Sequence, residues 1–136
     1  MPLGVNGRCD ILETMNSRNA ADAAGRPLRL AHLTTVDMSL VLLLGTELAA
    51  DREAGHEVFG LSTPGPYVPR VEALGVRHVP VPGFTREFSL PDDARAFAQL
   101  LAVLRGLHLD ILHTHTPKAG VMGRSAGRLA GVPVVV

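Results

Sequence analysis

The chain has 136 residues, a hydrophobic fraction of 46% and a formal net charge of +0, which suits one domain of ordinary size with a packed core. The neutral balance and the absence of tryptophan argue against a nucleic-acid-binding surface, which is normally basic and uses aromatic stacking. The single cysteine, Cys9, excludes an internal disulfide and is typical of a cytoplasmic protein.

Residues 1–27 show no clear hydrophobic period and lack the apolar core of about 7–15 residues that a signal peptide needs. We expect a weakly ordered tail here, and the alternative is a short helix that packs loosely on the domain. The longest apolar run, Leu40–Leu44, is far shorter than the roughly 20 residues of a membrane-spanning helix.

From residue 28 onward, expected strands alternate with expected helices. The strands are predicted at 28–34, 57–62, 76–81, 110–113 and 133–136, and the helices at 40–54, 67–74, 91–106 and 117–131. This alternation predicts an α/β fold, a Rossmann-like open parallel sheet with helices on both faces, over residues 28–136. We expect the first strand near the centre, between the third-second pair and the fourth-fifth pair.

Apolar spacing predicts which faces of the last two helices are buried. In the helix that starts at Pro91, the predicted stripe is Ala94, Phe97, Leu101 and Leu104. In the helix that starts at Pro117, it is Ala119, Met122, Ala126 and Leu129. Arg124 and Arg128 fall on the opposite, solvated side, and contact with anionic lipid headgroups is the alternative interpretation.

The loop after the first strand, residues 34–39, is the first candidate for ligand contact. It precedes a helix N-terminus, where N–H groups favour anions, but it lacks the G-x-G-x-x-G spacing of a dinucleotide site. Asp37 and Ser39 either cap the helix or contact a ligand, and the sequence favours neither alternative.

The segment His113-Thr-His-Thr-Pro-Lys118 is the stronger candidate, because it follows the fourth strand at its carboxyl end, where open α/β sheets bind ligands. Thr114, His115 and Thr116 can contact a polar ligand, and the alternative is that the histidines only pack and hydrogen-bond. His113 and His115 point to one side of a strand, as a metal pair would, but no Cys or Glu nearby in the sequence completes a set.

The sequence also predicts the surroundings of Lys118 and His32. Lys118 lies in the first helical turn, where it opposes the helix dipole; a bound phosphate or carboxylate would explain it, and an ordinary solvated lysine is the alternative. His32, inside the first strand, is expected to be a buried core histidine.

Several segments resemble the amino-terminal domain of family 4 glycosyltransferases. They are Asp110–Arg124, Ala130–Val136, Ala54–Val58 and Leu74–Val79, and the resemblance covers residues 28–136. It implies two Rossmann-like domains that face each other across a cleft, the GT-B arrangement. The first domain binds the acceptor and the second binds the nucleotide sugar, with no metal ion and no cofactor.

The resemblance therefore implies transfer of a sugar from a nucleoside-diphosphate sugar to an acceptor hydroxyl, in bacterial envelope or polysaccharide synthesis. The acceptor is expected to be lipid-linked or a small molecule, and the location cytoplasmic, with peripheral contact at the inner face of the plasma membrane. The residues expected to bind it are Asp37, Ser39, Thr114, His115, Thr116 and Lys118.

Two departures from the family pattern bear on these expectations. Many members have a Gly-Gly pair where this chain has residues 36–39, and the sequence stops at Val136, before any donor-binding domain. These 136 residues alone are therefore not expected to complete the reaction.

Two alternatives remain open. One is a sugar-nucleotide 2-epimerase of the same two-domain architecture. The other is a non-enzymatic α/β module such as a phosphoreceiver-like domain; a receiver needs an Asp at the end of the third strand, where this chain has Val79-Pro-Val-Pro82.

Overall fold

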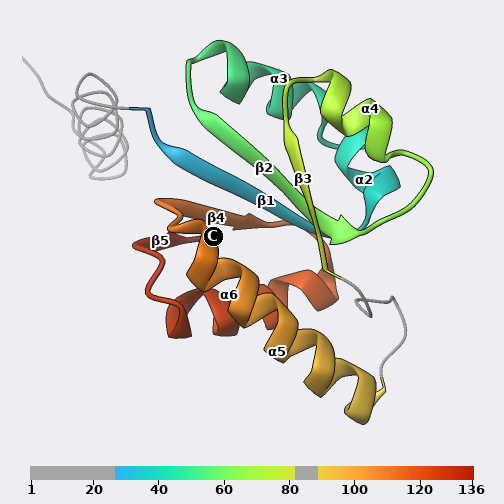
Figure 1. Cartoon of the computed structure of the whole chain (residues 1–136), viewed down its shortest axis with the longest axis vertical. Helices are drawn as coiled ribbons and strands as arrows, with labels where there is room; N and C mark the ends of the chain where they lie inside the picture. Colours follow the sequence, from blue (N-terminus) through green and yellow to red (C-terminus); the bar gives the residue numbers. More distant parts are fainter. Residues whose placement is uncertain (1–26, 82–88) are drawn as a thin grey trace, which may run out of the picture.

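A computed structural model describes residues 27–81 and 89–136, and its centre is a five-stranded, all-parallel sheet (Figure 1). The strands are β1 (Arg29–Val36), β2 (Glu57–Thr63), β3 (Arg77–Pro80), β4 (Ile111–Thr114) and β5 (Val134–Val135). Their order in the sheet is β3-β2-β1-β4-β5. The predicted parallel sheet, with the first strand between the two pairs, is therefore confirmed.

Helices cover both faces of the sheet (Figure 1). One face carries α2 (Asp37–Leu42), α3 (Gly45–Glu53) and α4 (Val68–Ala73), which share a core with Val58 and Val76. The other face carries α5 (Leu90–Leu107) and α6 (Pro117–Leu129), packed on a larger apolar cluster. The central strands β1 and β2 are buried on both faces, as their mostly apolar residues require.

Strand alternation decides which side chains reach which layer. In β1, Ala31 and Leu33 belong to the core under α5 and α6, so His32 points to the layer of α3. The register pairs His32 with His113 and Leu33 with Thr114, which brings two histidines of adjacent strands to the same layer.

The helix predicted over 40–54 is in fact two helices, α2 and α3, separated at Leu43 and Leu44. Leu44 is buried, whereas Leu43 is 74% exposed, so the chain turns one leucine inward and leaves the other in solvent. Gly45 follows the break, and glycine is a poor residue for carrying a helix onward. The sequence pattern missed this break because Leu40, Leu44 and Leu48 all reach the core and keep a helical spacing.

The predicted buried stripe of α5 is partly wrong. Ala96, Leu100 and Leu104 are buried, whereas Ala94 is exposed and Phe97 and Leu101 are half-buried. The stripe follows an i, i+4, i+8 row, so the helix is rotated from the expected orientation.

The end of α5 also differs from the prediction. The helix continues past Gly106 to Leu107, and His108 ends it in the left-handed conformation with φ 51°. A non-glycine residue in this conformation is uncommon, and the pattern placed the end at the nearest glycine instead.

In α6, Ala119 and Ala126 are buried as predicted, but Leu129 is 62% exposed and Met122 is half-buried. Gly123 and Gly127 face the sheet instead. A Cβ on Gly123 would lie 2.6 Å from Leu33 Cδ2 and from Thr114 Cγ2, so the helix backbone approaches the sheet too closely for any side chain there. Arg124 and Arg128 are exposed, as predicted.

The tail predicted over residues 1–27 falls, except for residue 27, outside the described ranges, and so does Cys9. Among the helices of the described part, none is long and apolar enough to cross a membrane.

Candidate functional site

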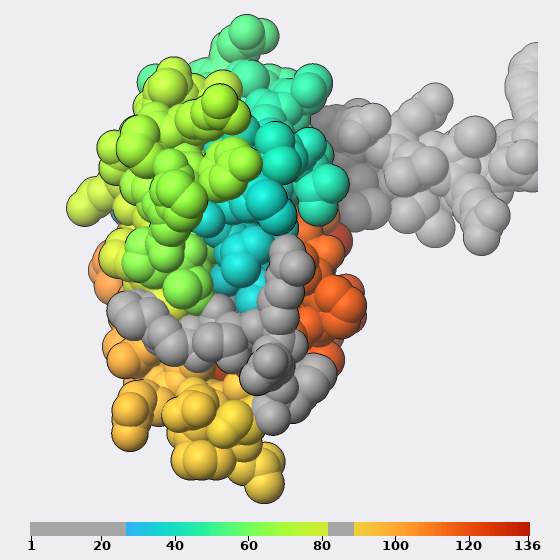
Figure 2. Space-filling model, turned by 90° about the vertical axis from the view of Figure 1, so that its right-hand side faces the viewer, coloured from blue at the N-terminus to red at the C-terminus, as the bar shows by residue number. Residues whose placement is uncertain are grey.

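The carboxyl edge of the sheet holds the polar residues that the sequence singled out. Figure 2 turns this edge to the viewer and shows α2 in cyan between α4 in green and the β4–α6 segment in orange. The six predicted acceptor residues do not form one cluster there. Their printed contacts lead to different parts of the chain around that edge.

Asp37 binds the chain that follows β2. Its Oδ2 accepts a hydrogen bond from the Tyr67 N–H at 2.7 Å, and its Oδ1 accepts one from the Met38 N–H at 2.9 Å. Gly65 approaches so closely that a Cβ there would lie 2.6 Å from Asp37 Oδ1. Asp37 is buried and is the first residue of α2, and Val36 occupies the N-cap position. Asp37 therefore does not cap the helix, and its carboxylate holds the β2–α4 loop instead.

Ser39 lies inside α2 and is also buried, and the helix begins before it. Its carbonyl accepts a hydrogen bond from the Leu43 N–H at the end of the helix, at 3.1 Å. The predicted capping role of Ser39 is therefore wrong.

Lys118 is buried, which excludes the alternative of an ordinary solvated lysine. Only 3% of the residue is exposed, and its Nζ lies 2.5 Å from Asp93 Oδ1 in the first turn of α5. The Lys118 ammonium lowers the pKa of the Asp93 carboxyl through a hydrogen bond. The carboxylate offsets the unfavourable position of a cation at a helix N-terminus, so a bound anion is not needed to explain it.

Thr114 and Thr116 face different partners. Thr114 Oγ1 donates to the Val136 carbonyl at 2.8 Å and so joins β4 to the end of β5. Thr116 precedes α6, makes no side-chain cap bond, and its hydroxyl lies 2.7 Å from that of Thr35. This last contact joins the end of β1 to the loop after β4, two strands that the predicted order had made neighbours.

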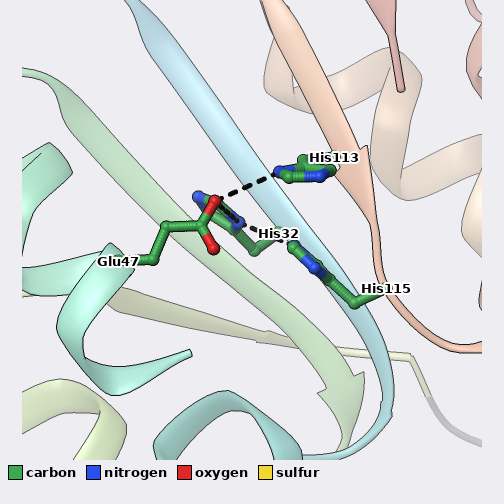
Figure 3. A group of neighbouring side chains, drawn as sticks. All are labelled: His32, Glu47, His113 and His115. Carbon is green, nitrogen blue, oxygen red and sulfur yellow. Dashed lines mark hydrogen bonds and ion pairs between the residues drawn. The ribbon is translucent and has the colours of Figure 1, made fainter. Parts of the chain in front are cut away.

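Three histidines gather on the α3 side of the sheet (Figure 3). The ring centroids of His113 and His115 are 4.0 Å apart, and His32 lies 5.1 Å from His115 and 5.5 Å from His113. His32 is buried, as the sequence predicted. Its ring, however, belongs to a polar network rather than to the apolar core.

The tautomer of His32 follows from its two partners. Its Nε2 lies 2.8 Å from Asp51 Oδ2, and a carboxylate only accepts, so Nε2 carries the proton. The lone pair of His32 Nδ1 is then free to accept from His115 Nε2, 2.9 Å away. Burial, with smaller contributions from His113 and His32, lowers the pKa of His115 to about 4, so this ring is neutral near pH 7.

Glu47 completes the group from α3 (Figure 3). Its Oε1 lies 3.3 Å from His113 Nδ1 and 4.0 Å from His32 Nδ1. Glu47 is far from His113 and His115 along the chain, so the residues next to these histidines in the sequence give no sign of it. The side chain of Glu47 reaches from α3 to His113 on β4, and only the fold reveals this proximity.

Comparison with known proteins identifies the family. A family model described as "Glycosyl transferase 4-like domain" matches residues 41–136, which is more than half of the chain. The chain therefore belongs to the family of glycosyl transferase 4-like domains. This confirms the resemblance inferred from the sequence and favours it over both alternatives.

One curated relative and two solved structures give further context. The UDP-Gal:alpha-D-GlcNAc-diphosphoundecaprenol alpha-1,3-galactosyltransferase of Escherichia coli is 46% identical over 61 residues, which are 45% of this chain and 16% of that enzyme. A glycosyltransferase from Rickettsia africae superposes with a TM-score of 0.61 at 13% identity, over 81% of this chain and 28% of that one.

The C-terminal domain of the PF1911 hydrogenase of Pyrococcus furiosus superposes with a TM-score of 0.56 at 13% identity, over 79% of this chain and 88% of that one. At such identities the superpositions show the fold alone. The matched region is also much shorter than the two glycosyltransferases themselves.

Proposed function

We propose that this chain is the acceptor-binding part of a glycosyltransferase, which moves a sugar from a nucleoside-diphosphate sugar to an acceptor hydroxyl. The family match over residues 41–136 carries this proposal. Catalysis of this kind requires that the acceptor hydroxyl be positioned and that the leaving diphosphate be stabilised. The domain described here serves the first requirement.

The acceptor we propose is a lipid-linked sugar diphosphate of bacterial envelope synthesis. The support is the Escherichia coli relative, whose name gives diphosphoundecaprenol-linked GlcNAc as acceptor and UDP-Gal as donor. The two sequences are 46% identical over 61 residues, which supports a related acceptor for this chain.

Of the six predicted residues, His115 and Thr116 are the ones we propose to contact the acceptor. Both are half-buried and follow directly after β4, at the carboxyl edge where open parallel sheets bind ligands. The buried residues Asp37, Ser39, Thr114 and Lys118 instead hold the loops and helices around that edge.

Peripheral contact with the membrane is proposed for one face of α6. Val121, which is 68% exposed, Arg124, Arg128 and Leu129 share this solvated face. Arginine beside exposed apolar side chains is the combination that binds an anionic lipid surface. A lipid-linked acceptor would reach the domain from such a surface.

The test is a titration of the purified chain with GlcNAc linked through diphosphate to a short prenyl chain, followed by calorimetry. We expect saturable binding of this acceptor analogue, a weaker response to UDP-galactose, and no sugar transfer by these 136 residues alone. Preference for the nucleotide sugar, or transfer without any other polypeptide, would contradict the proposal.

A matched pair of variants locates the binding. Thr116→Val removes the hydroxyl at the edge and should weaken the acceptor analogue, whereas Ser125→Ala, on the exposed side of α6, should leave binding unchanged. Equal affinity in the two variants would place the acceptor elsewhere.

A further inference from the structure

The three histidines and Glu47 have the composition and the spacing of a metal site. One ligand atom from each of His32, Glu47, His113 and His115 can be chosen so that all four lie within 4.8 Å of one another. Four ligands around Zn²⁺, with bonds near 2.0–2.1 Å, stand about 3.3 Å apart in a tetrahedron. The measured separations of 2.9, 3.3 and 4.0 Å lie on both sides of that value.

The scaffold holds most of these ligands in place before any ion arrives. His32 lies on β1 and His113 on β4, paired in register in the centre of the sheet, and His115 follows β4 directly. Glu47 comes from α3, and its side chain is 43% exposed, so it can close over an ion that enters from solvent (Figure 3). A site with rigid imidazoles and one movable carboxylate needs little rearrangement on binding.

Asp51 lies behind His32 and prepares it to bind a metal. Asp51 Oδ2 accepts the Nε2 proton of His32, and this leaves the Nδ1 lone pair pointing at the other imidazoles. A carboxylate behind a ligating histidine is the usual arrangement at zinc sites, where it fixes the tautomer that the metal requires. Glu47 and Asp51 also place two carboxylates beside the imidazoles, which favours a cation among them.

We propose that His32 Nδ1, His113 Nδ1, His115 Nε2 and a carboxylate oxygen of Glu47 bind one Zn²⁺ ion, which ties β1, β4 and α3 together. Three imidazoles and one carboxylate suit zinc better than the harder Mg²⁺ or Ca²⁺, which prefer oxygen ligands. Four protein ligands make a closed site that acts on stability rather than on chemistry. Ligation through Nε2 leaves Nδ1 of His115 for a contact at the sheet edge.

The experiment measures zinc affinity of the full chain in competition with a chromophoric chelator. A Cys9→Ser background removes the thiol, which is itself a strong zinc ligand. We expect one Zn²⁺ per chain and a higher melting temperature with zinc, because an ion that binds only the folded state stabilises it. Mg²⁺ at the same concentration should change neither measurement.

Matched variants then identify the ligands. Glu47→Gln and His113→Ala alter partly exposed side chains and should fold, as circular dichroism without zinc can verify. Their controls are Glu53→Gln on the same helix and His108→Asn at the end of α5, where asparagine tolerates the left-handed backbone. Asp51→Asn should lower the zinc affinity by roughly 10–100-fold, the usual effect of losing a residue that hydrogen-bonds a metal ligand. Glu47→Gln and His113→Ala should lower it by at least that much.

Absence of saturable zinc binding would overturn the proposal and leave the cluster as a hydrogen-bonded chain from His115 through His32 to Asp51. Stoichiometric binding that survives in Glu47→Gln and His113→Ala would overturn it as well. Neither result depends on the acceptor or on sugar transfer, so this proposal and the proposed function fail or stand separately.

Discussion

At the level of single residues, the buried contact between Lys118 and Asp93 joins the first turns of α6 and α5. We predict that Lys118→Met lowers the urea midpoint of unfolding, because Asp93 loses the cation that faces it. A second variant that also replaces Asp93 with leucine should recover much of the loss, since no unpaired carboxylate is left behind. A single variant as stable as the parent would show that the ion pair contributes nothing.

The same pair predicts a pH dependence. The folded-state pKa of Asp93 is lowered, so its ionised form stabilises the fold at pH values above its ordinary pKa of about 3.9. That stability is lost as the pH falls through the lowered folded value. The difference in free energy of unfolding between the parent and Lys118→Met should therefore be largest at neutral pH and should shrink in acid below about pH 4. A difference that persists unchanged in acid would exclude this cause.

Residue roles were the hardest feature to predict from the sequence. Residue type and position after a strand placed His115 and Thr116 at the carboxyl edge. The same reasoning offered Lys118 only a bound anion or solvent, whereas it is buried against Asp93. The partner of Lys118, Asp93, belongs to a different helix, and local spacing carries no information about such contacts. Glu47 was missed beside the histidines for the same reason.

At the level of elements, two glycines in helices are predicted to respond in opposite directions to alanine. Gly123→Ala places a Cβ 2.6 Å from Leu33 and Thr114, and overpacking of this kind should cost about 1–3 kcal/mol. Gly106→Ala meets nothing within 4 Å in the last turns of α5 and should stabilise by about 0.5–1 kcal/mol. Urea unfolding of both variants measures the difference, and equal effects would contradict the close approach of α6 to the sheet.

The helices show which part of an amphipathic pattern can be trusted. Apolar spacing, with Pro91 and Pro117 near the helix starts, predicted the existence of α5 and α6. Both helices are confirmed. The pattern did not predict their rotation, because more than one apolar row runs along each helix and the predicted stripes left out glycine. In α6 the face against the sheet is built from alanine and glycine, and Leu129 points to solvent.

At the level of the whole molecule, the exposed face of α6 predicts weak binding to membranes. The purified chain should sediment with vesicles that contain anionic lipid and not with neutral vesicles. A variant with Arg124→Gln and Arg128→Gln should bind about 30-fold more weakly, at about 1 kcal/mol for each arginine near the surface. Binding equal to that of the parent would rule out this face as the contact.

The architecture was the most predictable property. Alternation of strands and helices, with β1 opening the first half and β4 the second, is enough to give the observed strand order. The site was less predictable because it depends on contacts between elements far apart in the sequence, such as that between Glu47 of α3 and His113 of β4. The fold places the ends of β1 and β4 side by side. Which side chains meet there depends on the face of the sheet to which each one points.

The central claim is that the carboxyl edge of β1 and β4 binds the acceptor. Its most direct test is a two-dimensional NMR titration of the labelled full chain with GlcNAc linked through diphosphate to a short prenyl chain. The account predicts that amide shifts concentrate at Thr35, at His115 and Thr116 and in the first turn of α6, and that they saturate together. Shifts confined to the amino ends of the strands, or an absence of saturable shifts, would contradict it.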